Sequence, residues 1–195
     1  MVSLEELTLR SSYALIGLFL LLAASAEAGS FKANTDVETY VDANYIDQSF
    51  SDNDTLWAAS EDGKSFQEVY LSFVNLFGSQ GIFKPEQIQS ATLALDAVQV
   101  KEPGEIRAYL VHGATFDTAT WNDKPEYNPD VSASVEISKE GSYTIDVTPL
   151  IKKAVEICTE GCPYSIALVA EDGASVGFAS SRASSGSRPV LEYVS

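Results

Sequence analysis

Alternation of apolar and polar residues with a period of two is the feature of this sequence that most restricts its fold. In residues 68–74, every second side chain from Val69 to Phe73 is apolar, and residues 91–97 and 106–111 repeat the pattern. Successive side chains of a β-strand point to opposite faces of a sheet, so this spacing predicts half-buried strands.

Ten segments read as short strands, and clusters of Gly, Pro, Asn, Asp or Ser separate them. They are residues 38–42, 56–59, 68–74, 91–97, 106–111, 131–137, 143–147, 164–170, 176–179 and 190–194. Many short strands with turn signals between them are typical of an all-β fold. We therefore expect a single jelly-roll-like antiparallel β-sandwich, with no internal repeat and no linker.

One short helix is expected near the middle of the second half of the chain. Thr148 is placed to cap it, Pro149 fits the first helical position, and Gly161 is a suitable terminator. The apolar residues in between have helical spacing: Leu150, Ile151, Ala154, Val155 and Cys158. We expect this helix to close one end of the sandwich.

The first 28 residues are predicted to be a secretory signal peptide. Arg10 precedes the apolar run of residues 13–24, and Ala26 and Ala28 form an A-x-A cleavage site. A membrane anchor is the alternative, but a spanning helix needs about 20 apolar residues and this run is shorter. We therefore expect one domain over residues 29–195, secreted or at the cell surface, with no membrane span in the mature form.

The charge of the chain argues against nucleic acid as a partner. The full sequence has a formal charge of −16, and removing residues 1–28, with three carboxylates and one arginine, leaves −14. Such a surface repels nucleic acid and anionic membranes. It suits a soluble protein in salty or calcium-containing surroundings.

The two cysteines, Cys158 and Cys162, lie four residues apart with Gly161 between them. In an oxidising compartment this spacing predicts one small disulfide, because the glycine allows the chain to turn. A metal site is the alternative, but two thiols without a nearby histidine fall short of the usual four ligands.

The sequence gives little indication of catalysis. The single histidine, His112, follows a predicted strand, and the chain contains no phosphate-binding Gly-rich loop. Paired carboxylates of a glycosidase remain an alternative, since the chain has 28 acidic residues, but sequence does not reveal their separation. We expect a protein that is not an enzyme.

Acidic residues crowd the first part of the predicted domain, where Glu38, Asp42 and Asp54 are candidate ligands of a structural calcium ion. Calcium takes 6–8 oxygen ligands, many of them from loops. The spacing does not match an EF-hand, and a solvated acidic stretch is the alternative.

Aromatic side chains on polar strand faces suggest a sugar-binding platform. Sugar rings stack on aromatic faces through their apolar C–H groups, and Tyr70, Arg107 and Tyr109 are predicted to share the outer face of the sandwich. Tyr127 and Arg182 are further candidates. The alternative is that these tyrosines only cover the edge of the core with the hydroxyl in water. The two tryptophans, at positions 57 and 121, are expected in the core.

The order of the segments resembles the DNRLRE domain, also classed as carbohydrate-binding module family 96 and related to disaggregatase modules. Its most specific parts are Thr120-Trp-Asn-Asp-Lys-Pro125 and Asp146-Val-Thr148. Further matches are residues 38–42, 56–59, 69–76, 88–95, 164–170, 178–182 and 188–193.

The resemblance implies a jelly-roll-like sandwich that recognises extracellular polysaccharide, acidic in some members. Residues 68–76 lack the arginines often found there, and Ala183 replaces a common acidic residue. With the −14 charge, these departures favour a neutral glycan or a calcium-bridged contact. A structural or adhesive subunit of a matrix, sheath or filament, self-associating through strand edges, is the second hypothesis.

Overall fold

The computed structural model describes residues 29–113, 115 and 117–195, so the predicted signal peptide lies outside the described residues. The described part consists of eleven strands, the helix α2 (Thr148–Ile157) and two 3₁₀ turns, η1 (Gly78–Gln80) and η2 (Pro85–Gln87). The strands are β1 (Ser30–Asn34), β2 (Val37–Asp42), β3 (Thr55–Glu61), β4 (Lys64–Val74), β5 (Ser90–Glu102), β6 (Gly104–His112), β7 (Ser132–Ile137), β8 (Gly141–Asp146), β9 (Pro163–Ala170), β10 (Ser175–Ala179) and β11 (Val190–Val194).

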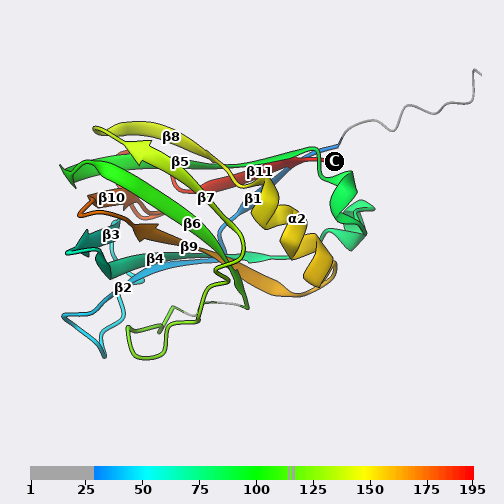
Figure 1. Ribbon diagram of the computed structural model, residues 1–195. Helices are drawn as coiled ribbons and strands as arrows, with labels where there is room; N and C mark the ends of the chain where they lie inside the picture. The colour runs from blue at the N-terminus through cyan, green and yellow to red at the C-terminus, as the bar shows by residue number, and fades with distance from the viewer. Residues whose placement is uncertain (1–28, 114, 116) are drawn as a thin grey trace, which may run out of the picture.

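The strands form one continuous antiparallel sheet that curls into two layers (Figure 1). Its order is β1-β11-β5-β10-β3-β4-β9-β6-β7, with β8 added to β5 and β2 added to β4. The long strands β4 and β5 each serve two partners along one edge, which is how so many short strands fit into two layers. The predicted all-β sandwich with one helix is confirmed.

All ten predicted strands are present, and the prediction missed only β1. This strand pairs with β11, so that the described ends of the chain meet: the Gly29 and Ser195 amides each donate to the other's carbonyl at 3.0 Å. Phe31 and Ala33 alternate with exposed Lys32 and Asn34. Such a short, half-exposed edge strand carries too little apolar alternation to stand out in the sequence.

The main core lies between the two layers and is built from the apolar side of each alternating strand. Val69, Leu71 and Phe73 of β4 face Leu93 and Leu95 of β5 across this core, and all five are buried. At about 25 cal/mol per Å² of apolar surface, this burial is the main term that stabilises the sandwich.

The helix α2 covers one end of the core, as expected, with Leu150, Ile151, Ala154 and Val155 buried. The predicted cap is wrong. Thr148 is already inside the helix, and Val147 precedes it without a side-chain cap. Asp146 lies just before the N-cap residue, and its Oδ1 accepts from the Thr148 amide at 3.0 Å. This carboxylate accepts two Thr148 hydrogen bonds, which lowers the pKa of Asp146.

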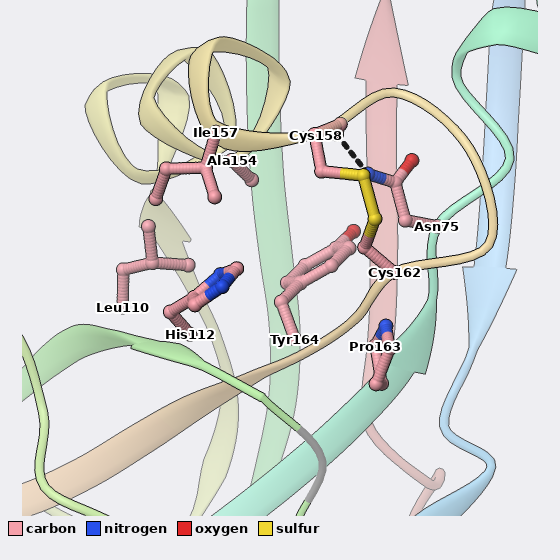
Figure 2. Close-up of a pocket in the computed structure, with 9 residues that line it drawn as sticks. All are labelled: Asn75, Leu110, His112, Ala154, Ile157, Cys158, Cys162, Pro163 and Tyr164. Carbon is pink, nitrogen blue, oxygen red and sulfur yellow. Dashed lines mark hydrogen bonds between the residues drawn. A yellow bond between two sulfur atoms is a disulfide. The ribbon is translucent and has the colours of Figure 1, made fainter.

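The helix ends at Ile157, before Gly161, and the predicted disulfide joins Cys158 to Cys162. Figure 2 shows this bridge beside a small hollow that His112 and Tyr164 also line. Asn75 donates a hydrogen bond to the Cys158 carbonyl, which ties the bridge to the end of β4. Over the described ranges, no helix has the length and apolar character needed to cross a membrane.

Candidate functional site

The outer face of the β4–β9–β6 layer carries the predicted platform residues in neighbouring rows. Tyr70 of β4, Ala167 of β9 and Tyr109 of β6 are direct register neighbours, and Glu68, Val169 and Arg107 form the next row. The predicted alternation, with Tyr70, Arg107 and Tyr109 on one face, is therefore correct.

The predicted exposure of Tyr70 is wrong. Its side chain is 0 % exposed and belongs to a second apolar cluster on the outer face, with Val41, Val111, Ala119 and Ala167. Two connections cover this face: residues 43–54, between β2 and β3, and residues 117–131, between β6 and β7. Figure 1 shows both below β2, β4 and β9, on the side away from β5 and β8. We call residues 117–131 the covering loop.

A buried ion pair attaches the covering loop to the sheet. The Lys124 Nζ lies 2.8 Å from Glu68 Oε2, and the Glu68 side chain is only 3 % exposed. The Tyr70 hydroxyl lies 3.0 Å from the same oxygen and 3.2 Å from the Pro125 carbonyl, within donating distance of both. Burial, with the Glu68 carboxylate second, raises the pKa of Tyr70 far above its ordinary value. Tyr70 is thus a support for the loop.

The Thr-Trp-Asn-Asp-Lys-Pro motif forms this attachment. The Asp123 carboxylate accepts from the amide and hydroxyl of Thr120, which closes a turn and lowers the pKa of Asp123. The Lys124 ammonium lies 3.4 Å from the centre of the Trp121 ring, a cation–π contact. Trp121 is half-buried against the outer-face cluster, whereas the sequence placed it in the core. Asn122 links the motif to the loop of residues 43–54, because its backbone amide donates to the Ile46 carbonyl at 3.2 Å.

A hydroxyl network fixes the chain just before the covering loop. The Ser72 and Ser165 hydroxyls are 2.7 Å apart on neighbouring strands, and the Thr115 amide lies 2.9 Å and 3.2 Å from them. All three residues are buried. Polar groups buried this completely are stable only because they bond to each other.

Beyond the covered region, Tyr109 and Tyr127 stack with ring centres 4.6 Å apart and planes at 23°. Both are half-buried, so each keeps surface in contact with water. Arg107 flanks them: its Nε lies 3.2 Å from Glu171 Oε1, and its Nη2 donates to Glu105. Burial raises the pKa of Tyr109, and the Glu171 carboxylate adds to the effect. We call Arg107, Tyr109 and Tyr127 the tyrosine shelf. The fold therefore brings together three of the five predicted sugar-binding residues.

Arg182 lies elsewhere, in the loop after β10. With Arg188 and Glu38 it lines a separate polar pocket that contains no shelf residue. Its Nη1 donates to the Ser51 carbonyl at 2.8 Å.

The structure does not bring the predicted calcium ligands together. Glu38 and Asp42 are buried at the β2 edge and hydrogen-bonded within the protein: Glu38 accepts from the Ser181 amide, and Asp42 from Gln67 Nε2 at 2.6 Å. Asp54 lies in an exposed loop. Across the described residues, no three His, Cys, Asp or Glu side chains gather closely enough to hold a metal ion.

Comparison with known proteins decides the family. Residues 29–194 match carbohydrate-binding module family 96. The chain belongs to this family. No curated protein matches. Among solved structures, the chain is similar to the enzymatically active domain of tailspike protein 4 from bacteriophage CBA120, with 11 % identity and a TM-score of 0.32. That alignment covers 87 % of this chain and 20 % of the tailspike chain.

The sequence interpretation missed the roles of Glu68 and Lys124. Membership in family 96 rests on a match that includes the Thr-Trp-Asn-Asp-Lys-Pro motif, and the structure shows what this motif does. The sequence offered only a weak signal: a lysine within the motif, and a glutamate on the polar side of an alternating strand.

Proposed function

We propose that this family 96 module binds polysaccharide outside the cell without cleaving it, and that the tyrosine shelf is its contact surface. The observation that carries the proposal is the stacked, half-exposed pair of Tyr109 and Tyr127 beside a fixed guanidinium. Membership in family 96 supports carbohydrate as the ligand class, and the geometry of the three shelf side chains supports this face as the contact surface.

The chemistry of the shelf suits a sugar chain. Exposed ring surface accepts the apolar C–H face of a pyranose, while Arg107 and its two carboxylate partners offer donors and acceptors to hydroxyl groups. Because stacking and ion pairs already hold these side chains, little conformational entropy is lost on binding. Glu105 and Glu171, the carboxylates beside the shelf, are both paired with Arg107, which suits hydrogen bonding to a ligand better than a role in bond cleavage.

Two features support a location outside the cell. The predicted signal peptide directs export, and a disulfide such as Cys158–Cys162 persists in oxidising compartments.

The test is a binding screen of the purified protein against neutral and acidic polysaccharides, with calcium and with chelator, followed on a sizing column. Tyr109→Ala and Tyr127→Ala are compared with Tyr143→Ala, a half-buried tyrosine on β8 in the other layer. We expect each shelf variant to remain folded and to lose about tenfold in affinity, or about 1.4 kcal/mol.

Each other outcome would count against the proposal. Shelf variants that bind as tightly as Tyr143→Ala would exclude the shelf as the contact surface. Release of new reducing ends or unsaturated products would show an enzyme. Concentration-dependent assembly without glycan binding would instead favour a structural subunit.

A further inference from the structure

A polar pocket lies at the β1–β2 end of the outer layer, separate from the tyrosine shelf. Its cavity volume is about 200 Å³. The side chains that matter to its chemistry are Thr35, Asp36, Asp117, Ser181, Arg182 and Arg188. Among the residues that the structure describes, the lining is polar and charged apart from Val37, which suits a ligand held by hydrogen bonds.

The two arginines of the pocket differ in their engagement. Arg182 is held by the Ser51 carbonyl at 2.8 Å and lies 3.5 Å from Asp52. Arg188 makes no ion pair with any residue that the structure describes, and its side chain is exposed at the pocket wall. Asp36 is likewise exposed there. The pocket therefore offers charged donors and acceptors that the protein does not itself use.

The balance of charge selects the ligand class. Three carboxylates, Asp36, Glu38 and Asp117, line the pocket against the two guanidinium groups, in a domain whose formal charge is strongly negative. An anionic group would meet net repulsion. A pair of neighbouring hydroxyls does not, since each hydroxyl donates to a carboxylate and accepts from a guanidinium. We infer that this pocket binds one uncharged sugar unit through its hydroxyl groups, an inference that rests on the proposed carbohydrate binding.

The pocket is a small hollow. Its cavity volume of about 200 Å³ leaves room for a single sugar ring. The pocket is therefore suited to the end of a chain or to a side branch, whereas the open shelf suits a stretch of polymer.

Pocket and shelf lie within reach of one oligosaccharide. The pocket is beside β2 and the shelf is on β6, with β4 and β9 between them, so their separation across the sheet is three strand spacings, about 14 Å. The covering loop contributes Asp117 to the pocket and Tyr127 to the shelf. A glycan that engages both sites would bind more tightly than either site allows alone.

The test is an amide-resolved NMR titration of the purified protein with the methyl glycosides of glucose, galactose, mannose and N-acetylglucosamine, and with methyl glucuronide as the charged probe. We expect saturable shifts in residues 35–38 and 181–188 with at least one neutral glycoside. Arg188→Ala should weaken that binding at least fivefold. The matched control, Lys64→Ala, removes an exposed cation from the β3–β4 hairpin and should change nothing.

Several results would overturn the inference: no response to any glycoside, a response to the glucuronide alone, shifts confined to the shelf, or wild-type affinity in Arg188→Ala. Loss of polymer binding in the shelf variants together with a silent pocket would refute this inference and leave the proposed function standing. If a glycoside binds in the pocket while the shelf variants retain full polymer affinity, the shelf is refuted as the contact surface and the inference about the pocket stands.

Discussion

Removing the ammonium group of Lys124 should destabilise this domain far more than its position in a loop suggests. The Lys124→Met variant keeps most of the apolar stem but leaves the Glu68 carboxylate, 3 % exposed, without its cation. Breaking a buried ion pair from one side costs about 3–5 kcal/mol. Because the Lys124 side chain is itself 23 % exposed, we expect the lower end, about 3 kcal/mol. For a domain of this size that loss corresponds to a melting temperature about 6–12 °C lower.

The assay is urea and thermal unfolding of single and double variants. Glu68→Gln should cost only about 1 kcal/mol, since the amide still accepts from the Tyr70 hydroxyl and the freed ammonium reaches water. Adding Glu68→Gln to Lys124→Met should recover part of the loss, because the stranded charge is gone. Lys153→Met is the matched control: its pair with Glu156, at 2.9 Å, is on the surface, so it should cost less than about 0.5 kcal/mol. Equal costs for the two lysine variants, or no recovery in the double variant, would refute this reasoning.

Three further predictions concern the disulfide, the hydroxyl network and alkaline pH. Replacing Cys158 and Cys162 by serine should cost about 2 kcal/mol, the loop-closure term for a short loop, measured by urea unfolding against the oxidised protein. Ser165→Ala should cost about 1–3 kcal/mol in the same assay, because it removes the hydroxyl that bonds to the buried Thr115 and Ser72 hydroxyls. The folded state raises the pKa of Tyr70, so this group contributes stability that is complete below about pH 10, its unfolded value, and that falls as the pH rises further. Unfolding at pH 9 and 11 should show this fall, and Tyr70→Phe should reduce it.

The strands and the inner core could be predicted because their signals are local. Alternation in residues 68–74 identifies β4 and the core face of Val69, Leu71 and Phe73 without knowledge of any partner strand. The same pattern does not determine whether the other face meets water. Glu68 and Tyr70 look like solvent-facing residues in the sequence, yet they lie beneath a loop that follows them by some fifty positions in the chain. Alternation therefore predicts which residues share a face, and loop packing determines the exposure of that face.

The predicted site divides for the same reason. Tyr70 and Tyr109 lie in one register row, separated only by Ala167, so alternation predicts the same exposure for both. The covering loop packs over β4, where it buries Tyr70, and leaves Tyr109 on β6 half-exposed against Tyr127. The positions of the acidic calcium candidates have a different cause. Glu38 and Asp42 are close in sequence, but their oxygens accept hydrogen bonds from Ser181 and Gln67, which only the folded chain brings near.

The covering loop links the stability of this module to its proposed binding surface. Lys124 contributes to the ion pair beneath the loop, and Tyr127, three residues later, contributes to the shelf. Asp117, at the other end of the same loop, lines the polar pocket. A loop without these attachments would have to lose its freedom each time a glycan bound, and that entropy would reduce the affinity. The buried pair of Glu68 and Lys124 adds little net stability compared with an apolar pair, so its value lies in fixing where the loop sits. The Thr-Trp-Asn-Asp-Lys-Pro motif, whose Lys124 makes this pair, therefore supports the proposed binding surface indirectly, by fixing the loop that carries Tyr127.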